Sequence, residues 1–263
     1  MLTSAWALGL TLALTAGPQS PQSAEPPAEP TAVAATTPAA PAARDEQKFT
    51  QPFQDLLRNL VRDMRALPSR RTAFIIGAGT GGALALHAAD DNVARWALTS
   101  GHSGYSNIGD VLGDGWTQAA GAIGAYTYGY FNKQPRTTHI GTDLIRAQIL
   151  NGLVTTSTKV IAQRERPGGG PHSFPSGHTS AAFVSASVLQ AHLGWKTGAP
   201  AYALASYIGW TRLRDDRHWL TDVIVGAAIG TAVGQSVSRG HRPGGWTIAP
   251  VATTNSAAIY FTK

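Results

Sequence analysis

Three short segments between residues 159 and 222 concentrate basic side chains and histidines. In the first, Lys159 and Arg166 are seven residues apart, so a continuous helix would place both on one face, about 20° apart. Pro167 then ends the helix and starts a glycine-rich loop. Two cations at the mouth of a loop suit the oxygens of one oxyanion, although Lys and Arg on a helix also commonly mark a solvated face.

The second segment, residues 174–180, reads Phe-Pro-Ser-Gly-His-Thr-Ser and precedes an apolar run. Ser176 after a proline predicts the N-cap of a helix over 176–193, and that interpretation requires no catalysis. A helix start is also an anion site, where Ser176 can donate its hydroxyl and Gly177 allows the backbone to approach closely. His178 lies one turn inside the helix, where an imidazole could protonate a leaving oxygen.

The third segment contains Arg212, His218 and Asp222. A helix over 218–237 would stack Asp222 on the same face as His218. The carboxylate would then fix the imidazole tautomer and leave the other ring nitrogen as nucleophile or base, although the same pair also occurs as a simple surface contact. Because Arg212 would fall on another face of a continuous helix, we expect a break at Asp215–Asp216, with one of these two capping the helix that carries His218.

Together the segments offer three permanent cations, neutral donors and two histidines. The three positive charges would repel Zn²⁺ or Mg²⁺, and two His and one Asp are a poor remaining ligand set. A phosphate dianion satisfies the whole set, because phosphoryl transfer requires neutralised oxygens with the nucleophile and leaving group in line. His218 and His178 supply those two ends, so we expect no metal and no cofactor.

This sequence resembles the type 2 phosphatidic acid phosphatase (PAP2) superfamily, which also includes bacterial non-specific acid phosphatases and vanadium haloperoxidases. The resemblance is carried by Lys-x6-Arg-Pro at 159–167, Pro-Ser-Gly-His at 175–178 and Arg-x5-His-x3-Asp at 212–222, in the family's order. The third motif usually opens with Ser-Arg, and here Thr211 replaces the serine while keeping a hydroxyl. The resemblance implies an all-α protein, a single helical-bundle domain, and a metal-free phosphohydrolase acting on phosphomonoesters or diphosphates.

Carried over position by position, the resemblance implies that His218 attacks phosphorus to form a phosphohistidine and that Asp222 orients it. His178 would protonate the leaving alcohol and later activate water. The residues that hold the phosphate oxygens would be Lys159, Arg166, Ser176, Gly177 and Arg212. Assigning His218 as the nucleophile also rests on its pairing with Asp222, because an imidazole whose proton is fixed on one nitrogen is the better nucleophile.

Two other functions remain compatible with these motifs. One is a vanadate-dependent haloperoxidase, in which the same cations hold vanadate as a cofactor and His218 ligates vanadium. The other is a non-catalytic phosphate- or lipid-headgroup-binding module. In the phosphatase interpretation the partner is a phosphorylated small-molecule or lipid substrate and not a nucleic acid, while peripheral membrane contact and the oligomeric state stay open.

The composition of the 263 residues is 43% apolar and 14% charged, with no cysteine. This chain can bury a substantial core, and it has no disulfides, thiolate metal sites or cysteine nucleophile. The mean hydropathy of −0.08 is low for a polytopic membrane protein, so we expect a soluble or peripheral protein.

Three regions follow one another along the chain. Residues 1–17 hold a short apolar run typical of a signal peptide, although it lacks Lys and Arg, and they predict export to the periplasm. Residues 18–43 are rich in Pro and Ala and predict a disordered linker. Residues 44–263 contain all 21 basic residues and 13 of the 15 acidic ones, a net charge of +8, and form the expected helical domain with a short β-hairpin at 246–262.

The helical part uses many small residues. A Gly-x-Gly-x-x-Gly stretch at 77–82 matches a dinucleotide-binding motif, but it lacks a preceding strand and an acid about 20 residues on, so we expect a closely packed helix there. Breaks are expected at Pro68, 101–110, Pro135, 167–175 and 198–200. Helices are predicted for residues 52–66, 73–89, 91–99, 116–131, 140–165, 176–193, 198–213 and 218–237.

Overall fold

The structure, a computed structural model, describes residues 52–99, 106–239, 247–253 and 256–262. The predicted signal peptide at 1–17 and the predicted linker at 18–43 lie outside the described residues and stay predictions. Residues 51–243 form one compact unit, and the C-terminal hairpin belongs to another unit that is described here by itself.

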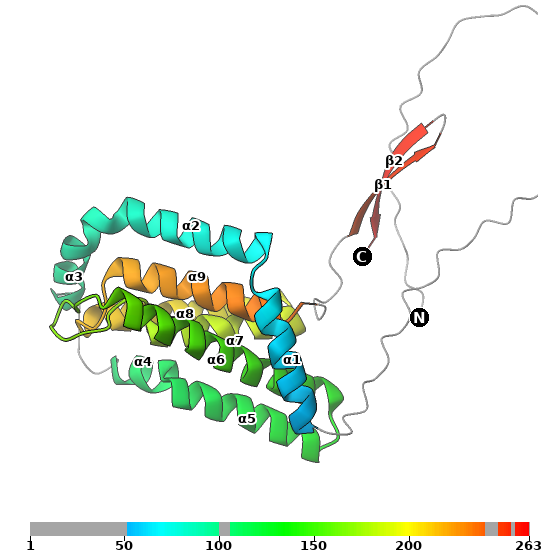
Figure 1. Cartoon of the computed structure of the whole chain (residues 1–263), viewed down its shortest axis with the longest axis horizontal. Helices are drawn as coiled ribbons and strands as arrows, with labels where there is room; N and C mark the ends of the chain where they lie inside the picture. Colours follow the sequence, from blue (N-terminus) through cyan, green and yellow to red (C-terminus); the bar gives the residue numbers. More distant parts are fainter. Residues whose placement is uncertain (1–51, 100–105, 240–246, 254–255, 263) are drawn as a thin grey trace, which may run out of the picture. The chain divides into compact units, whose positions relative to one another are not determined.

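The larger unit is all-α, as the sequence predicted (Figure 1). Its elements in chain order are α1 (Pro52–Ala66), α2 (Arg70–Leu86), the 3-10 turn η1 (His87–Ala89), α3 (Asp90–Thr99), α4 (Ser106–Gly113), α5 (Gly115–Phe131), α6 (Pro135–Ala162), α7 (Gly177–Leu193), α8 (Trp195–Arg214) and α9 (Leu220–Val237).

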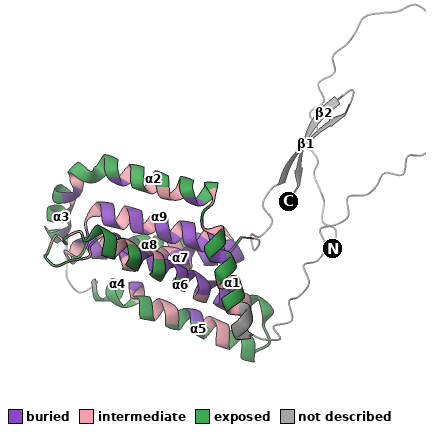
Figure 2. Ribbon diagram, viewed as in Figure 1, coloured by how far each residue is buried: buried purple, intermediate pink, exposed green. Residues whose placement is uncertain are grey.

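Helix α7 packs against α6, α8 and α9, while α2 lies along α9 and α5 lies along α6 (Figure 1). The main core is formed by branched and small side chains of these helices, among them Leu150, Val184, Val188, Ile229 and Val233. Figure 2 shows the result: α7 and α9 are mostly buried, whereas the outer surfaces of α2 and α5 are exposed.

Glycines bring the backbones of α7 and α9 close together. A Cβ atom added to Gly230 would lie 2.2 Å from the carbonyl oxygen of Ser180, and one added to Gly234 would lie 2.6 Å from the Cβ of Ser187. The Gly-x-Gly-x-x-Gly stretch lies inside α2, where Gly79 packs against Ala228 of α9, while a Cβ added to Gly77 or Gly82 would meet nothing within 4 Å. The expected helix is confirmed, and its close packing on a neighbour is present at Gly79.

A buried ionic cluster attaches α1 to the bundle. The guanidinium of Arg146 in α6 donates to Asp63 of α1 over 2.8 Å and to Asp143 over 2.6 Å. Asp143 also contacts Nε2 of His192 at 2.9 Å, which extends the cluster to α7. Since a buried charge requires a partner, these contacts fix how α1, α6 and α7 pack.

Two predicted breaks are wrong. Residues 198–200 lie inside α8. The helix tolerates Gly198 because this glycine packs directly on Gln190, and it tolerates Pro200 because a proline near the helix start removes only one backbone hydrogen bond. Part of the break expected at 101–110 is helix α4, which the pattern missed because of its two glycines. Both are required by packing: a Cβ at Gly109 would lie 2.1 Å from Oγ1 of Thr211, and one at Gly113 would lie 2.5 Å from Ile208.

The C-terminal hairpin has the strands expected from the sequence. Strand β1 (Thr247–Thr253) pairs antiparallel with β2 (Ser256–Thr262), with Thr253 opposite Ser256 and Thr247 opposite Thr262. The two residues that connect the strands, 254–255, lie outside the described residues.

We predict that Gly230→Ala destabilises the protein by about 1–3 kcal/mol, because the added methyl group forces α7 and α9 apart. Gly77→Ala in α2 is the matched control, since an added Cβ there meets nothing within 4 Å. That variant should be unchanged or more stable by about 0.5–1 kcal/mol, as expected for Gly→Ala in an exposed helix. Thermal and denaturant unfolding measure both, and equal stability of the two variants would contradict the packing argument.

Candidate active site

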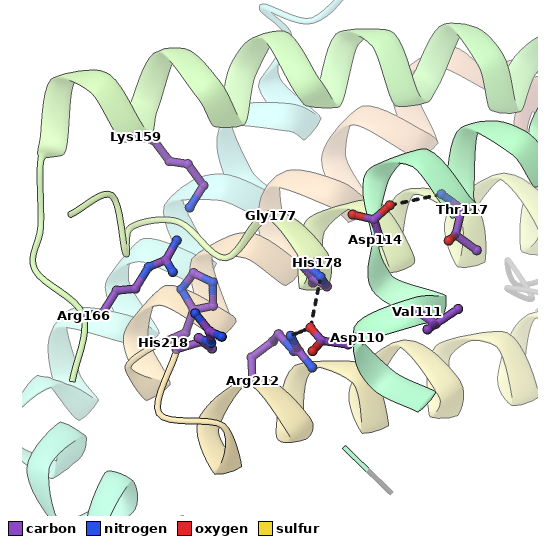
Figure 3. Close-up of a pocket in the computed structure, with 11 residues that line it drawn as sticks. Asp110, Val111, Asp114, Thr117, Lys159, Arg166, Gly177, His178, Arg212 and His218 are labelled. Atoms are coloured by element: carbon purple, nitrogen blue, oxygen red, sulfur yellow. Dashed lines mark hydrogen bonds and ion pairs between the residues drawn. The ribbon is translucent and has the colours of Figure 1, made fainter. Parts of the chain in front are cut away.

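One cavity of about 700 Å³ opens at the ends of several helices (Figure 3). Its walls come from α4 and the start of α5, the end of α6 and the loop that follows, the start of α7, the end of α8, and the loop before α9. Six of the eight residues predicted from the sequence line it, namely Lys159, Arg166, Gly177, His178, Arg212 and His218. Segments distant in the sequence therefore converge on one space.

Lys159 and Arg166 both line the cavity, but they do not share a helical face as expected. Helix α6 ends at Ala162, and Gln163 takes a left-handed conformation, so Arg166 lies in the loop and not on a helical face. The loop is held by its own backbone, where the N–H of Arg166 donates to the carbonyl of Gly170 over 2.9 Å. The prediction of a helix to residue 165 is wrong because the left-handed residue, and not the proline, ends it.

The ammonium group of Lys159 is anchored at the cavity wall. Nζ donates to the carbonyl oxygens of His172 at 2.8 Å and Ser173 at 3.4 Å. Burial and, after it, the neighbouring positive charge of Arg166 together lower the pKa of Lys159 to about 8. An anion bound beside Lys159 would favour the charged form.

Ser176 and Gly177 begin α7, as predicted. The side chain of Ser176 is fully buried and accepts a hydrogen bond from the hydroxyl of Thr179 at 2.9 Å, while its N–H donates to the carbonyl of Asp222 at 3.0 Å. The structure thus places Gly177, and not the Ser176 hydroxyl, on the cavity wall. A role for Ser176 in holding phosphate stays a prediction.

His178 faces the cavity from the first turn of α7, and its Nε2 atom lies 3.6 Å from Oδ1 of Asp110 (Figure 3). Burial and, after it, the positive charge of Arg212 lower the pKa of His178 to about 4. The carboxylates of Asp110 and Asp114 act in the opposite direction, as expected of nearby negative charges.

Arg212 lies in the last turn of α8 and is 2% exposed. Its guanidinium contacts Asp110, and Nη2 donates to Oδ2 of Asp215 over 2.8 Å. The hydroxyl oxygen of Thr211 accepts from Nε at 3.3 Å and from Nη2 at 3.2 Å. The threonine that replaces the family's usual serine therefore keeps a hydroxyl contact to the arginine.

His218 lies in the loop before α9 and not on a helix as expected. Helix α8 ends at Arg214, Asp216 has a φ of 56°, and α9 begins at Leu220. The break expected at Asp215–Asp216 is present, but neither residue caps α9 at its N-cap position, which is Trp219. Asp222, in the first turn, accepts from the N–H of Trp219 at 2.9 Å instead.

The predicted pairing of His218 with Asp222 is nevertheless present, with Nδ1 and Oδ2 3.6 Å apart. Within the described part of the chain, Nδ1 makes no hydrogen bond at this distance, and the Asp222 carboxylate is the charged group that faces it. Since Nδ1 faces Asp222, Nε2 is the ring nitrogen left for the cavity. Burial lowers the pKa of His218, as do the charges of Lys159 and Arg166, so the free ring is neutral at neutral pH.

Asp222 is fully buried beneath the cavity and receives several donors. They are the hydroxyl of Ser173, the N–H of Trp219 and, at 2.6 Å, Nη1 of Arg164. Burial alone would raise the pKa of Asp222, but the contacts with His218 and these donors together lower it. The carboxylate is thus held ionised.

Arg164 connects Asp222 to α3. Its Nη2 atom donates to Oδ2 of Asp90 over 2.7 Å, and Asp90 also accepts from the N–H of Thr221 at 3.0 Å. The sequence motifs assign no role to Arg164 or to Asp90. Their spacing carries no signal, because the two residues meet only through the fold.

Asp110 and Asp114 were also missed, and both line the cavity. A signal for them exists in the sequence, since they are the only Asp, Glu, Lys or Arg residues between Arg95 and Lys133. Arg217, beside His218, is a further lining residue. Among the residues that the structure describes, no group of three or more His, Asp or Glu side chains is arranged to hold a metal ion.

The fold and the site define an all-α protein whose cavity is lined by cations and two histidines. The family model described as PAP2 superfamily matches residues 155–243 of this chain. That segment contains every site residue predicted from the three motifs. This match confirms the resemblance to the PAP2 superfamily over the segment that carries the three motifs, about one third of the chain.

Similar proteins include a lipid A 1-phosphatase from Porphyromonas gingivalis, 28% identical over 155 residues, which are 56% of this chain and 33% of the relative. A probable diacylglycerol pyrophosphate phosphatase 1 from Schizosaccharomyces pombe is 38% identical over 105 residues, 35% of this chain and 36% of the relative. The chain thus spans about one third of the length of these curated relatives. Among solved structures, that of Aquifex aeolicus LpxE has a TM-score of 0.47 and 24% identity, over 55% of this chain and 92% of that one.

Because the pKa of Lys159 is lowered to about 8, we predict that anion binding weakens as the pH rises through this value. Sulfate is a suitable probe, since it is tetrahedral and its charge is constant in this range. Calorimetric titration should show an affinity that falls by about fivefold between pH 8 and pH 9, because the free site loses its ammonium charge. Lys159→Arg, which keeps its charge, should retain its affinity. A wild-type affinity that is constant over this range would contradict the role of Lys159.

Proposed function

We propose that this protein is a metal-independent phosphohydrolase that cleaves phosphomonoesters or diphosphates through a phosphohistidine intermediate. One observation supports this most strongly: three cations and two histidines, supplied by three separate segments of the chain, line one cavity (Figure 3). The family match and the phosphatase names of the relatives support the same reaction class.

In this proposal the phosphoryl group lies between Lys159, Arg166 and Arg212, with the start of α7 at Gly177 below it. The three cations neutralise the oxygens, and the amide groups of a helix start add a partial positive charge. Bound in this way, the phosphorus is held between the two histidines, as an in-line displacement requires.

The Nε2 atom of His218 then attacks phosphorus, forming an N–P bond while the bond to the leaving oxygen breaks. His178 donates a proton to that oxygen, so a neutral alcohol departs. The low pKa of His178 in the free site rises when the phosphate dianion binds beside it, which allows His178 to carry this proton.

In the second step water attacks phosphorus and the N–P bond breaks. His178 now accepts the proton of the water, which restores both histidines and releases inorganic phosphate. Asp222 stabilises the positive charge on His218 in the intermediate, and Arg164 and Ser173 hold Asp222 in place.

The substrate proposed is a phosphorylated lipid or small molecule. Two of the relatives bear the names of phosphatases of lipid A and of diacylglycerol pyrophosphate. Large apolar side chains are also exposed on the outer helices, with Phe74 of α2 76% exposed and Trp116 of α5 86% exposed. These surfaces are suited to an environment of lipid.

We further propose that the protein is exported and acts in the periplasm, either soluble or at the membrane surface. Two segments are long and apolar enough to cross a membrane, Arg70–Thr99 and Leu220–Val237. The second is 67% buried inside the bundle, as a core helix is, whereas the first is 11% buried (Figure 2).

The first test of the mechanism is removal of the two histidines. His218→Ala should lose detectable hydrolysis of p-nitrophenyl phosphate, and rapid quenching of the wild type in alkaline denaturant should trap a phosphohistidine that is stable to alkali and lost on acid treatment. His178→Ala should lose about 10²–10⁴-fold on alkyl phosphates and less on p-nitrophenyl phosphate, whose leaving group needs no proton. EDTA should leave the wild-type rate unchanged.

Circular dichroism of both variants controls for folding. A folded His218→Ala enzyme with the wild-type rate, or complete loss of wild-type activity in EDTA, would refute the mechanism. Halide oxidation with peroxide and added vanadate would favour the haloperoxidase alternative, and saturable phosphate binding without turnover would favour the binding module.

The proposed location at the membrane surface predicts which treatment extracts the protein from a membrane fraction. High salt or alkaline carbonate should release it from the membrane fraction of the producing cells, because a peripheral protein is held by surface contacts. A protein that stays in the pellet until detergent is added would instead span the bilayer through α2 or other outer helices.

A further inference from the structure

The cavity has two ends of opposite charge (Figure 3). Lys159 and Arg166 lie on the side of His218, where the proposed function places the phosphoryl group. Asp110 and Asp114 lie on the other side, beyond His178, and we call these two residues the acidic end. The leaving group of a substrate bound between the histidines would extend into this end.

Asp110 is the member of the acidic end that reaches the reacting groups. Its Oδ1 atom contacts Nη1 of Arg212 and lies 3.6 Å from Nε2 of His178. These are the two groups that an ester's leaving oxygen would approach. The side chain is 55% exposed, so the carboxylate stays accessible to a leaving group that enters this end.

The positive charge of Arg212 does not neutralise the acidic end. The same guanidinium also donates to Asp215, so one cation faces two carboxylates. With Asp114 nearby, the cavity beyond His178 keeps net negative charge. Charge of this kind in a partly enclosed site acts over several ångströms.

Packing fixes the position of Asp110. Its neighbour Gly109 contacts Thr211, and an added Cβ there would lie 2.1 Å from the threonine Oγ1. At the end of the same helix, an added Cβ at Gly113 would lie 3.1 Å from the Cβ of His178. Helix α4 therefore lies directly on the segments that carry Arg212 and His178.

We propose that the acidic end, chiefly Asp110, selects substrates by the charge of their leaving group. It favours phosphomonoesters whose leaving group is neutral or cationic over diphosphates, whose leaving group is itself an anion. This inference rests on the proposed function. It narrows the proposed substrates from phosphomonoesters or diphosphates to phosphomonoesters.

The chemistry of the first step explains the preference. When the P–O bond of a monoester breaks, the proton from His178 makes the leaving group a neutral alcohol. When the substrate is a diphosphate, the departing phosphate keeps negative charge next to Asp110. Repulsion then raises the energy of both the bound substrate and the transition state, so kcat/KM falls.

The test compares phosphoethanolamine, with its cationic leaving group, and inorganic pyrophosphate. For the wild type, kcat/KM should be higher with phosphoethanolamine. Asp110→Asn should raise kcat/KM for pyrophosphate relative to phosphoethanolamine by about tenfold, since one negative charge is removed. Asp114→Asn should shift the ratio in the same direction by less, because Asp110 is the carboxylate that contacts Arg212 and faces His178. The variant should fold, since the amide oxygen of asparagine still caps α5.

Asp91→Asn is the matched control, because it removes the same charge from an exposed side chain outside the cavity. Its ratio should equal that of the wild type. A merely structural role of Asp110 would lower both values of kcat/KM together and leave the ratio unchanged.

An unchanged ratio in Asp110→Asn and Asp114→Asn, or an equal shift in Asp91→Asn, would overturn the inference while leaving the phosphatase function intact. If Asp110→Asn does not fold, Asp114→Asn alone decides by the same ratio. A wild type that hydrolyses neither compound nor p-nitrophenyl phosphate would refute the proposed function itself.

Discussion

The candidate site depends on one buried carboxylate, that of Asp222. Its side chain receives hydrogen bonds from Ser173 and Arg164 of the α6–α7 connection and from the first turn of α9, and it faces His218. Its carbonyl accepts the N–H of Ser176 at the start of α7. A buried anion must be compensated, so these segments can come together in few other ways. The same contacts that satisfy the charge also aim the ring of His218 at the cavity.

Small residues make this convergence possible. The glycines of α9 let it approach α7 at backbone distance, and Gly109 lets α4 lie against Thr211. Because the helices pack closely, the ends of α6, α7 and α8 lie near one another at the cavity. Side chains from five separate segments can therefore surround one small ligand. Close packing of backbones thus serves the site as much as the stability of the bundle.

Much of this organisation was predictable from the sequence. The helical class follows from composition and periodicity. The three motifs correctly predicted that Lys159, Arg166 and His178 share one site, because their side chains suit one anionic ligand. Local geometry was predicted less well, since the left-handed residue at Gln163 has no strong sequence signal. Asp110 and the partners of Asp222 could not be assigned, because their roles arise only from contacts between helices far apart in the chain.

The loops after α6 and before α9 are joined to each other at several points. The N–H of Gly168 donates to the carbonyl of Asp216 at 3.0 Å, and Nε1 of Trp219 donates to the carbonyl of Glu165 at 2.9 Å. The guanidinium of Arg164 also lies 5.4 Å from the centre of the Trp219 ring. These contacts join the two loops into one hydrogen-bonded unit. In the proposed reaction, little conformational entropy would then be lost when an anion binds, so binding energy would serve the chemical step and not the ordering of the loops.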